Sequence, residues 1–243
     1  MQSVLADSRG QNAARVVQLG DLGTGPTSGS VHAFEAARTF LEGFHVPYDL
    51  VTGNHDLEGP EFDTDADNLA AWQDTFQRRH HWVHDVGPCI LVGLSTTRYR
   101  SNTLSHHEVH IDAEQRDWLE GVLADVGADK PAILFTHAPP MGCGLKVINS
   151  LHIKNRCVAG SSLPALPHAA TVPSGAQACQ RHVCRCAWLN HSGEADVFLD
   201  VVRRHPRIKA WFSGHFHLSH NYADSISVAS GCAFVQVRAA VLC

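Results

Sequence analysis

The sequence lacks the features that mark several large classes of protein. No apolar run approaches the length that spans a bilayer, so we expect no membrane-spanning helix. The formal net charge of −5 argues against a general nucleic-acid or anionic-membrane binder, because both use a basic surface. The Gly-x-Ser-x-Gly elbow and the His-Glu-x-x-His helix are also absent, which disfavours the hydrolases that depend on those motifs.

A secretory leader and a disulfide framework are missing as well. The N-terminus has no charged leader followed by an apolar segment, so it does not resemble a signal peptide. The 8 cysteines have no regular spacing, which in a chain of 243 residues fits reduced thiols better than disulfides. We therefore expect an intracellular, reducing compartment, with the cytoplasm as the default and organelle targeting left open.

The pattern of apolar residues predicts an α/β fold. An apolar content of 44% is enough for one domain with a sizeable core. Short runs of β-branched and aromatic residues alternate with helical patterns over the first two thirds of the chain, and Asp112 with Gln115 forms a capping pair at one helix start. The expected strands are 16–19, 48–51, 90–94, 132–135 and 208–212, and the expected helices include 34–44, 69–76, 118–122 and 197–202.

Four short polar clusters follow the expected strands. They are Gly20-Asp21, Gly53-Asn54-His55-Asp56, Thr136-His137 and Gly214-His215-Phe216-His217. Their oxygen and imidazole donors suit manganese, iron or zinc better than a thiolate site would. A single His or Asp at a strand end is more often a turn or capping residue than a ligand. Together, however, the four clusters favour one shared metal site.

The order of these motifs resembles that of the calcineurin-like metallophosphoesterases, from Leu19 to about Val237. That family's pattern runs Asp-x-His, Gly-Asp, Gly-Asn-His-Asp/Glu, His and Gly-His-x-His. The resemblance implies a four-layer sandwich of two packed mixed sheets flanked by helices. It also implies metal-dependent hydrolysis of a small phosphomonoester or phosphodiester, with two transition-metal ions that activate a water molecule.

The resemblance further implies the metal ligands. Asp21 would bridge both ions, and His217 would bind one of them. The other ion would be completed by Asn54, His137 and His215.

Roles for the neighbouring residues also come from the resemblance. His55 would be the general acid that protonates the leaving group, and Asp56 would orient it. Gly20, Gly53 and Gly214 would allow the sharp backbone turns that bring the next side chain to the ions.

The family's opening Asp-x-His motif is absent. Asp7 is the only upstream candidate, but too few residues separate it from Gly20 for a strand, a crossover helix and a second strand. We expect residues 2–11 to be the end of that helix and the first strand to lie upstream of Met1. One metal site would then keep few protein ligands, so this chain would hold one ion tightly. The alternative function is an N-terminally incomplete, non-catalytic chain that acts as an interaction platform or is inactive.

We expect residues 1–243 to form a single domain that carries a disordered insertion at 158–185. The insertion is rich in Pro, Ser, Gly and Ala and has no acidic or aromatic residue. A Cys/His cluster near its end offers zinc ligands, although the spacing matches no common zinc pattern. The cluster consists of Cys179, His182, Cys184 and Cys186.

Charged and titratable residues outside the motifs are unevenly distributed. No acidic residue occurs in 131–193, and a basic rim of Lys146, Lys154 and Arg156 would suit an anionic substrate. Acidic residues gather in 56–67, where we expect a solvated loop that leads into a helix near Asn68. The remaining histidines in polar surroundings are expected on the surface: His80, His81, His84, His106, His107 and His110. The substrate and the oligomeric state stay open.

Overall fold

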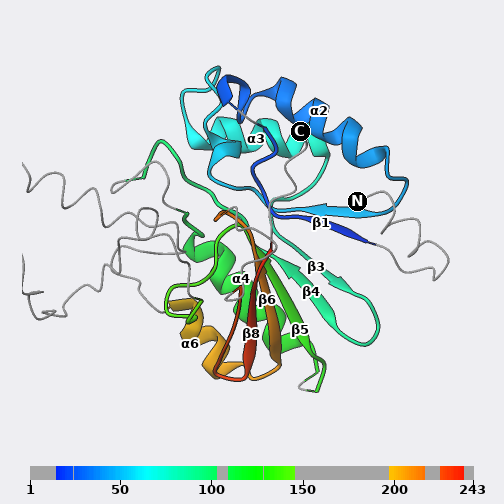
Figure 1. Ribbon diagram of the computed structural model, residues 1–243, viewed down its shortest axis with the longest axis vertical. Coiled ribbons are helices and arrows are strands. Elements are labelled where there is room, and N and C mark those ends of the chain that lie inside the picture. Colours follow the sequence, from blue (N-terminus) through cyan, green and yellow to red (C-terminus); the bar gives the residue numbers. More distant parts are fainter. Residues whose placement is uncertain are drawn as a thin grey trace, which may run out of the picture.

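The computed structural model describes residues 15–23, 25–102, 109–127, 129–145, 197–216 and 225–237. They form a two-stranded sheet and a six-stranded sheet with helices on the outer sides (Figure 1). The smaller sheet pairs β1 (Val16–Gln18) with β2 (Tyr48–Leu50). The larger sheet has the strand order β3-β4-β5-β6-β8-β7. Its strands are β3 (Trp82–Asp85), β4 (Ile90–Gly93), β5 (Ala132–Thr136), β6 (Ile208–Ser213), β7 (Ile226–Ala229) and β8 (Cys232–Gln236).

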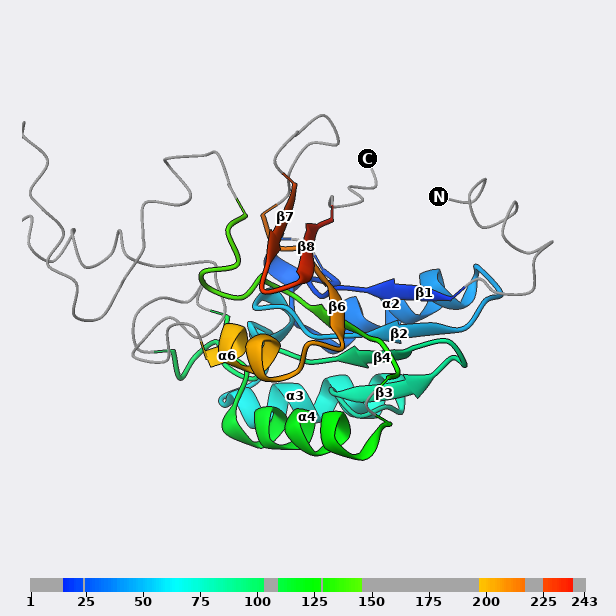
Figure 2. The same ribbon diagram turned by 90° about the horizontal axis from the view of Figure 1, so that it is seen from below.

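The larger sheet is mixed and strongly twisted. Strands β4, β5, β6 and β8 are parallel, whereas β3 and β7 run antiparallel at the two edges. In Figure 2, β3 and β4 lie nearly across the direction of β7 and β8, as the usual sheet twist produces. These features confirm the α/β prediction with one correction, because the smaller sheet is a parallel pair and not a mixed sheet among the described residues.

Helices α2 (Val31–Glu42) and α3 (Asp65–Phe76) pack together on the smaller sheet. Their shared core is aromatic and aliphatic, and includes Phe34, Leu41, Leu50, Trp72 and Phe76. Burying side chains of this size contributes about 1.5–3 kcal/mol each, so this core is a main reason that the short β1–β2 pair is stable.

Side-chain caps fix where these two helices begin. The Ser30 side chain accepts a hydrogen bond from the backbone of Ala33, and the Thr64 side chain accepts one from Asp67. Because Thr64 is the cap, α3 begins at Asp65, four residues before the predicted range of 69–76. Acidic groups in the first turn of α3 also complement the helix dipole.

Helices α4 (Ala113–Asp125) and α6 (Val197–Arg204) pack against the larger sheet through Leu119, Phe198 and Val202. The Asp112 side chain accepts a hydrogen bond from the backbone of Gln115 at 2.9 Å, which confirms the predicted cap. The Gln115 side chain, however, bonds both backbone groups of Ser95, so it ties α4 to the end of β4.

The two sheets meet along β2 and the β3–β4 hairpin. The indole nitrogen of Trp82 donates to the carbonyl of Leu50 at 2.7 Å, and a side chain at Gly93 would overlap the Trp82 ring. Past the strand ends, the backbone nitrogen of Thr96 donates to the carbonyl of Thr52 at 3.1 Å. These contacts hold the ends of strands from both sheets at one place.

The lengths of the helices and the state of the cysteines bear on two further expectations. None of the helices among them is long and apolar enough to span a bilayer. The three described cysteines, Cys89, Cys143 and Cys232, are free thiols.

Candidate metal centre

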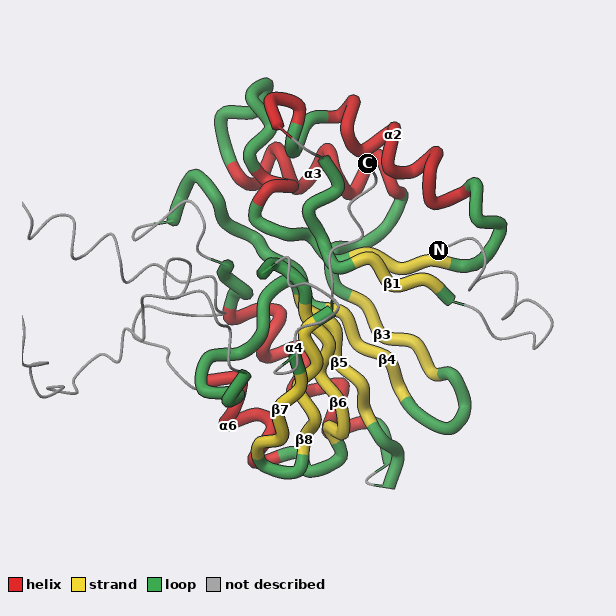
Figure 3. Tube along the Cα trace, in the orientation of Figure 1, coloured by secondary structure: helices red, strands yellow, loops and turns green. Residues whose placement is uncertain are grey.

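The carboxyl ends of β1, β2, β5 and β6 converge in the middle of the molecule, and the described residues of the predicted motifs lie in the loops that follow them (Figure 3). Asp21, His137 and His215 come from three of these loops, and their ligand atoms lie within 4.8 Å of one another. Asp21 Oδ2 is 3.2 Å from His137 Nε2, which is 2.8 Å from His215 Nδ1. Three of the five predicted ligands therefore surround one point.

Asn54 supplies a separate observation that favours a metal. Its side chain is fully buried, and neither amide atom has a hydrogen-bond partner among the described residues. Leaving a buried polar group unsatisfied costs about 1–3 kcal/mol, so such a group needs an explanation. A cation held by Asn54 Oδ1 would supply the partner that this oxygen lacks. The next residue, His55, donates its backbone N–H to Asp21 Oδ1 at 3.1 Å and so links this loop to the carboxylate.

The hydrogen bond that His137 makes to the backbone selects one tautomer. His137 Nδ1 lies 2.6 Å from the carbonyl oxygen of Leu19. A carbonyl can only accept, so Nδ1 carries the proton, and in the neutral ring Nε2 keeps its lone pair. Nε2 is the atom that faces Asp21 and His215, which is the orientation that a metal ligand requires.

The electrostatics of the centre favour positive charge beside Asp21. Burial alone would raise the pKa of Asp21, but His137, His215 and His55 hold it well below its usual range. Burial lowers the pKa of His137, but Asp21, the Leu19 carbonyl and Asp56 together raise it above its usual value. A buried carboxylate that draws a proton onto its neighbour also attracts a metal ion.

Backbone geometry at the centre is unusual. Asp21 and His215 have φ values of 60° and 73°, in the left-handed region that side chains other than glycine rarely adopt. Gly20 has φ of 93°, and a Cβ there would lie 2.8 Å from His137 Nδ1. A Cβ at Gly53 would overlap the Asp21 carboxylate. Glycine is therefore required at both positions.

The structure shows no need for glycine at position 214. Its φ lies outside the left-handed region, and a Cβ there would make only ordinary contacts at 3.6 Å. The left-handed residue in this loop is His215. Hydrogen bonds from both sides hold the loop, since Gly214 donates to the His137 carbonyl at 2.7 Å and accepts from the Gln236 side chain.

Asp56 makes different contacts from those predicted. Its buried carboxylate accepts backbone N–H groups from Asp21 at 2.8 Å, Leu22 at 2.7 Å and Gly53 at 2.7 Å. Burial and the negative charge of Asp21 nevertheless raise the pKa of Asp56 to about 6. The carboxylate thus joins the loops after β1 and β2, and does not pair with the His55 ring as the sequence had suggested.

The carboxylate that His55 meets is Glu58, with 2.7 Å between Nδ1 and Oε1. None of the sequence motifs includes this residue. The spacing of the two residues could have indicated the contact. Glu58 follows His55 by three positions across the short 3₁₀ turn η2 (His55–Leu57), and side chains at i and i+3 eclipse in that geometry.

Several predictions fall outside the described residues. They concern the ligand His217, the basic residues Lys146, Lys154 and Arg156, the insertion at 158–185 with its Cys/His cluster, and residues 2–11 with Asp7.

Comparison with known proteins supports the fold. No family model matches the chain. A probable cyclic nucleotide phosphodiesterase of Rhodopseudomonas palustris is 26% identical over 133 residues, which are 52% of this chain and 44% of that protein. The chain therefore spans less than half the length of this curated relative.

Two solved structures resemble the chain over nearly its whole length. A dimetal phosphatase from Danio rerio has a TM-score of 0.58 at 16% identity, covering 98% of this chain and 76% of that one. A Thermus thermophilus protein has a TM-score of 0.50 at 11% identity, covering 97% and 81%. Identities this low bear on the fold alone. In fold and in the order of its motifs, the chain resembles the calcineurin-like metallophosphoesterases, as its sequence indicated.

Proposed function

We propose that this chain is a metal-dependent phosphoesterase that hydrolyses a small phosphomonoester or phosphodiester. The observation that carries the proposal is the convergence of Asp21, His137 and His215. The buried, unpartnered amide of Asn54 supports it, because Asn54 precedes His55, whose backbone N–H donates to Asp21. The partial match to a probable cyclic nucleotide phosphodiesterase supports the reaction class and a small phosphorylated substrate.

One ion would be held by Asp21, Asn54, His137 and His215, whose oxygen and imidazole donors suit manganese, iron or zinc. A second would depend on Asp21 and His217. When bound, the metal would neutralise phosphate charge and lower the pKa of a water molecule, which would supply a hydroxide nucleophile near neutral pH.

The protein's own residues do the positioning and the proton transfer. The Leu19 carbonyl orients His137, and Asp56 fixes the backbone on both sides of Asp21. His55 lies near enough to Asp21 for its charge to act on that carboxylate. We assign His55 as the general acid. As the bond between phosphorus and the leaving oxygen breaks, the oxygen keeps the electron pair and takes the proton from His55 Nε2.

The competing function is a non-catalytic chain with the same fold, and one observation favours it. The residues before Gly20 contain no Asp-x-His motif. Such a chain would bind one ion, or none, and serve as an interaction platform or have no activity.

Hydrolysis of aryl phosphate monoesters and diesters, measured with added manganese and after chelation, distinguishes these functions. The proposal predicts metal-dependent hydrolysis that is lost in His137→Ala. The control is His32→Ala, an exposed histidine on α2, which should leave the rate unchanged. Tight metal binding without any hydrolysis would instead support the non-catalytic chain.

A further inference from the structure

The contact between His55 and Glu58 fixes the ring beside the metal centre. Glu58 Oε1 lies 2.7 Å from His55 Nδ1, and the two side chains are 21% and 35% exposed. A carboxylate only accepts, so this hydrogen bond places a proton on Nδ1 and leaves Nε2 for another partner. The backbone nitrogen of His55 donates to Asp21, so both ends of the residue are held.

Glu58 is itself held from a second direction. The hydroxyl of Tyr99, in the loop that follows β4, is hydrogen-bonded to the Glu58 carboxylate. The carboxylate therefore lies between an imidazole N–H and a phenol O–H. An ordinary surface pair has no such second donor and contributes little.

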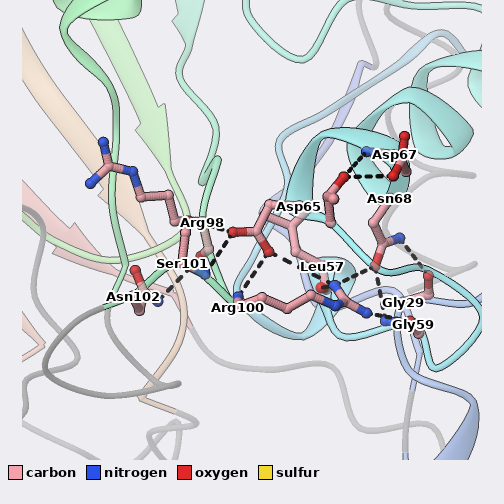
Figure 4. Close-up of polar contacts among 11 residues, drawn as sticks. Gly29, Leu57, Gly59, Asp65, Asp67, Asn68, Arg98, Arg100, Ser101 and Asn102 are labelled. Carbon is pink, nitrogen blue, oxygen red and sulfur yellow. Dashed lines mark hydrogen bonds and ion pairs between the residues drawn. The ribbon is translucent and has the colours of Figure 1, made fainter.

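The backbone on either side of Glu58 is fixed by Arg100 (Figure 4). The Arg100 guanidinium donates to the carbonyls of Leu57 and Gly59, which flank Glu58 in the chain. Arg100 is anchored in turn by Asp65, whose carboxylate accepts its backbone N–H at 2.8 Å. One arginine thus ties the Glu58 loop to the start of α3.

Asn68 closes the loop from the other side. Its Oδ1 accepts the Gly59 N–H at 2.9 Å, and its Nδ2 donates to the Gly29 carbonyl at 2.8 Å, both in the buried interior. A Cβ at Gly59 would overlap the Gly29 carbonyl, so the two segments approach as closely as glycine permits. A shift of Glu58 would break several buried polar contacts at once, which is costly where the local dielectric is low.

We infer that Glu58 is the positioning residue of His55, held for that purpose by Tyr99 and the Arg100 contacts. The inference rests on the proposed function. In the doubly protonated ring, Nε2 gives its proton to the leaving oxygen as that oxygen receives the electron pair of the breaking bond to phosphorus. The ring is left as the neutral Nδ1–H tautomer, still hydrogen-bonded to Glu58.

The tautomer of His55 tests the inference without any measurement of activity. Long-range ¹H–¹⁵N spectra of the zinc-loaded, full-length chain at mildly alkaline pH report which nitrogen carries the proton, and His55→Gln identifies the signals. The wild type should show the Nδ1–H form. Glu58→Ala should shift the ring toward the Nε2–H form, which free histidine prefers. Glu58→Gln, which keeps an acceptor oxygen, should retain the Nδ1–H form.

The matched control is Glu61→Ala. Glu61 lies in the same loop and also accepts a hydrogen bond, from the backbone of Val31 at 2.9 Å, but it does not contact His55. This variant should leave the His55 tautomer unchanged. An unchanged tautomer in a folded Glu58→Ala protein would overturn the inference, as would an Nε2–H form in the wild type.

Kinetics supply the functional half of the test. Glu58→Ala should lower kcat about 10–100-fold for an alkyl phosphate ester, whose leaving group needs a proton, with little change in KM. The loss for a nitrophenyl ester should be no more than about threefold. Equal losses on both esters would exclude the positioning role even if the tautomer shifts. A wild type that hydrolyses neither ester would contradict the proposed function, while the spectra would still decide whether Glu58 orients His55.

Discussion

His137 at the end of β5 is hydrogen-bonded to the carbonyl of Leu19 at the end of β1, with 2.6 Å between Nδ1 and the oxygen. The two residues are 118 positions apart in the sequence and belong to different sheets. The candidate metal centre therefore depends on how the two sheets meet. Changes at this junction should weaken metal binding before they remove secondary structure.

Gly53→Ala should reduce both metal affinity and stability. The new Cβ would overlap the Asp21 carboxylate and lie 2.7 Å from His137 Cε1, so the loop must move. We expect a loss of about 1–3 kcal/mol in the free energy of unfolding, typical of overpacking. Urea denaturation and metal titration measure the two effects.

The matched control for that prediction is Gly121→Ala. Gly121 lies inside α4 with open space around it, so alanine should stabilise the helix by about 0.5–1 kcal/mol and leave metal affinity unchanged. If both glycine variants bound metal like the wild type, the close approach at Gly53 would not matter for the centre.

Asp56→Asn should act mainly on stability. The carboxylate accepts three backbone N–H groups, and an amide of the same shape replaces one acceptor oxygen with a donor. We expect a loss of about 1–3 kcal/mol in the free energy of unfolding, with weaker metal binding as the loops loosen. A variant of normal stability and metal affinity that loses only turnover would restore the sequence-based role of Asp56 as the partner of His55.

Stability should fall as the pH is lowered, partly through His80. The sequence predicted a surface residue, but the ring is largely buried and its Nδ1 lies 2.9 Å from Gln73 Nε2. Burial, and next the neighbouring His81, lower the pKa of His80 from 6.5 to about 4. Between these values the unfolded chain binds the proton and the folded chain does not. The contribution of His80 to the free energy of unfolding is therefore fully present above pH 6.5 and is lost progressively toward pH 4.

Unfolding free energies of the wild type and His80→Gln between neutral pH and pH 4.5 measure this contribution. The variant should lose less stability on acidification, by on the order of 1–2 kcal/mol. His32→Gln, at an exposed position on α2, is the control for the substitution itself. Parallel curves for the wild type and His80→Gln would contradict the assignment.

Local sequence patterns predicted the elements of the fold well but not their pairing. Apolar runs located β1, β2, β4, β5 and β6, and polar residues that follow three of them, Asp21, His137 and His215, converge. Periodicity does not reveal that β8 lies between β6 and β7, because that order depends on contacts between distant segments.

The partners of site residues were the least predictable part. Asp56 and His55 are adjacent in sequence, yet the Asp56 carboxylate accepts hydrogen bonds from backbone N–H groups of a loop more than thirty residues away. His55 instead meets Glu58 across one short turn. Which carboxylate faces which group depends on the exact path of the backbone, and residue type and spacing do not specify that path.

Metal content after exhaustive dialysis tests the central claim most directly. Protein loaded with zinc or manganese should retain close to one equivalent per chain, because the proposal gives one ion four protein ligands, of which Asp21, His137 and His215 lie close together. Asn54→Leu, similar in size and without polar atoms, should fold and lose most of the bound metal. If the wild type retained no metal, or Asn54→Leu retained as much as the wild type, the buried amide would not be a ligand and the proposed centre would be wrong.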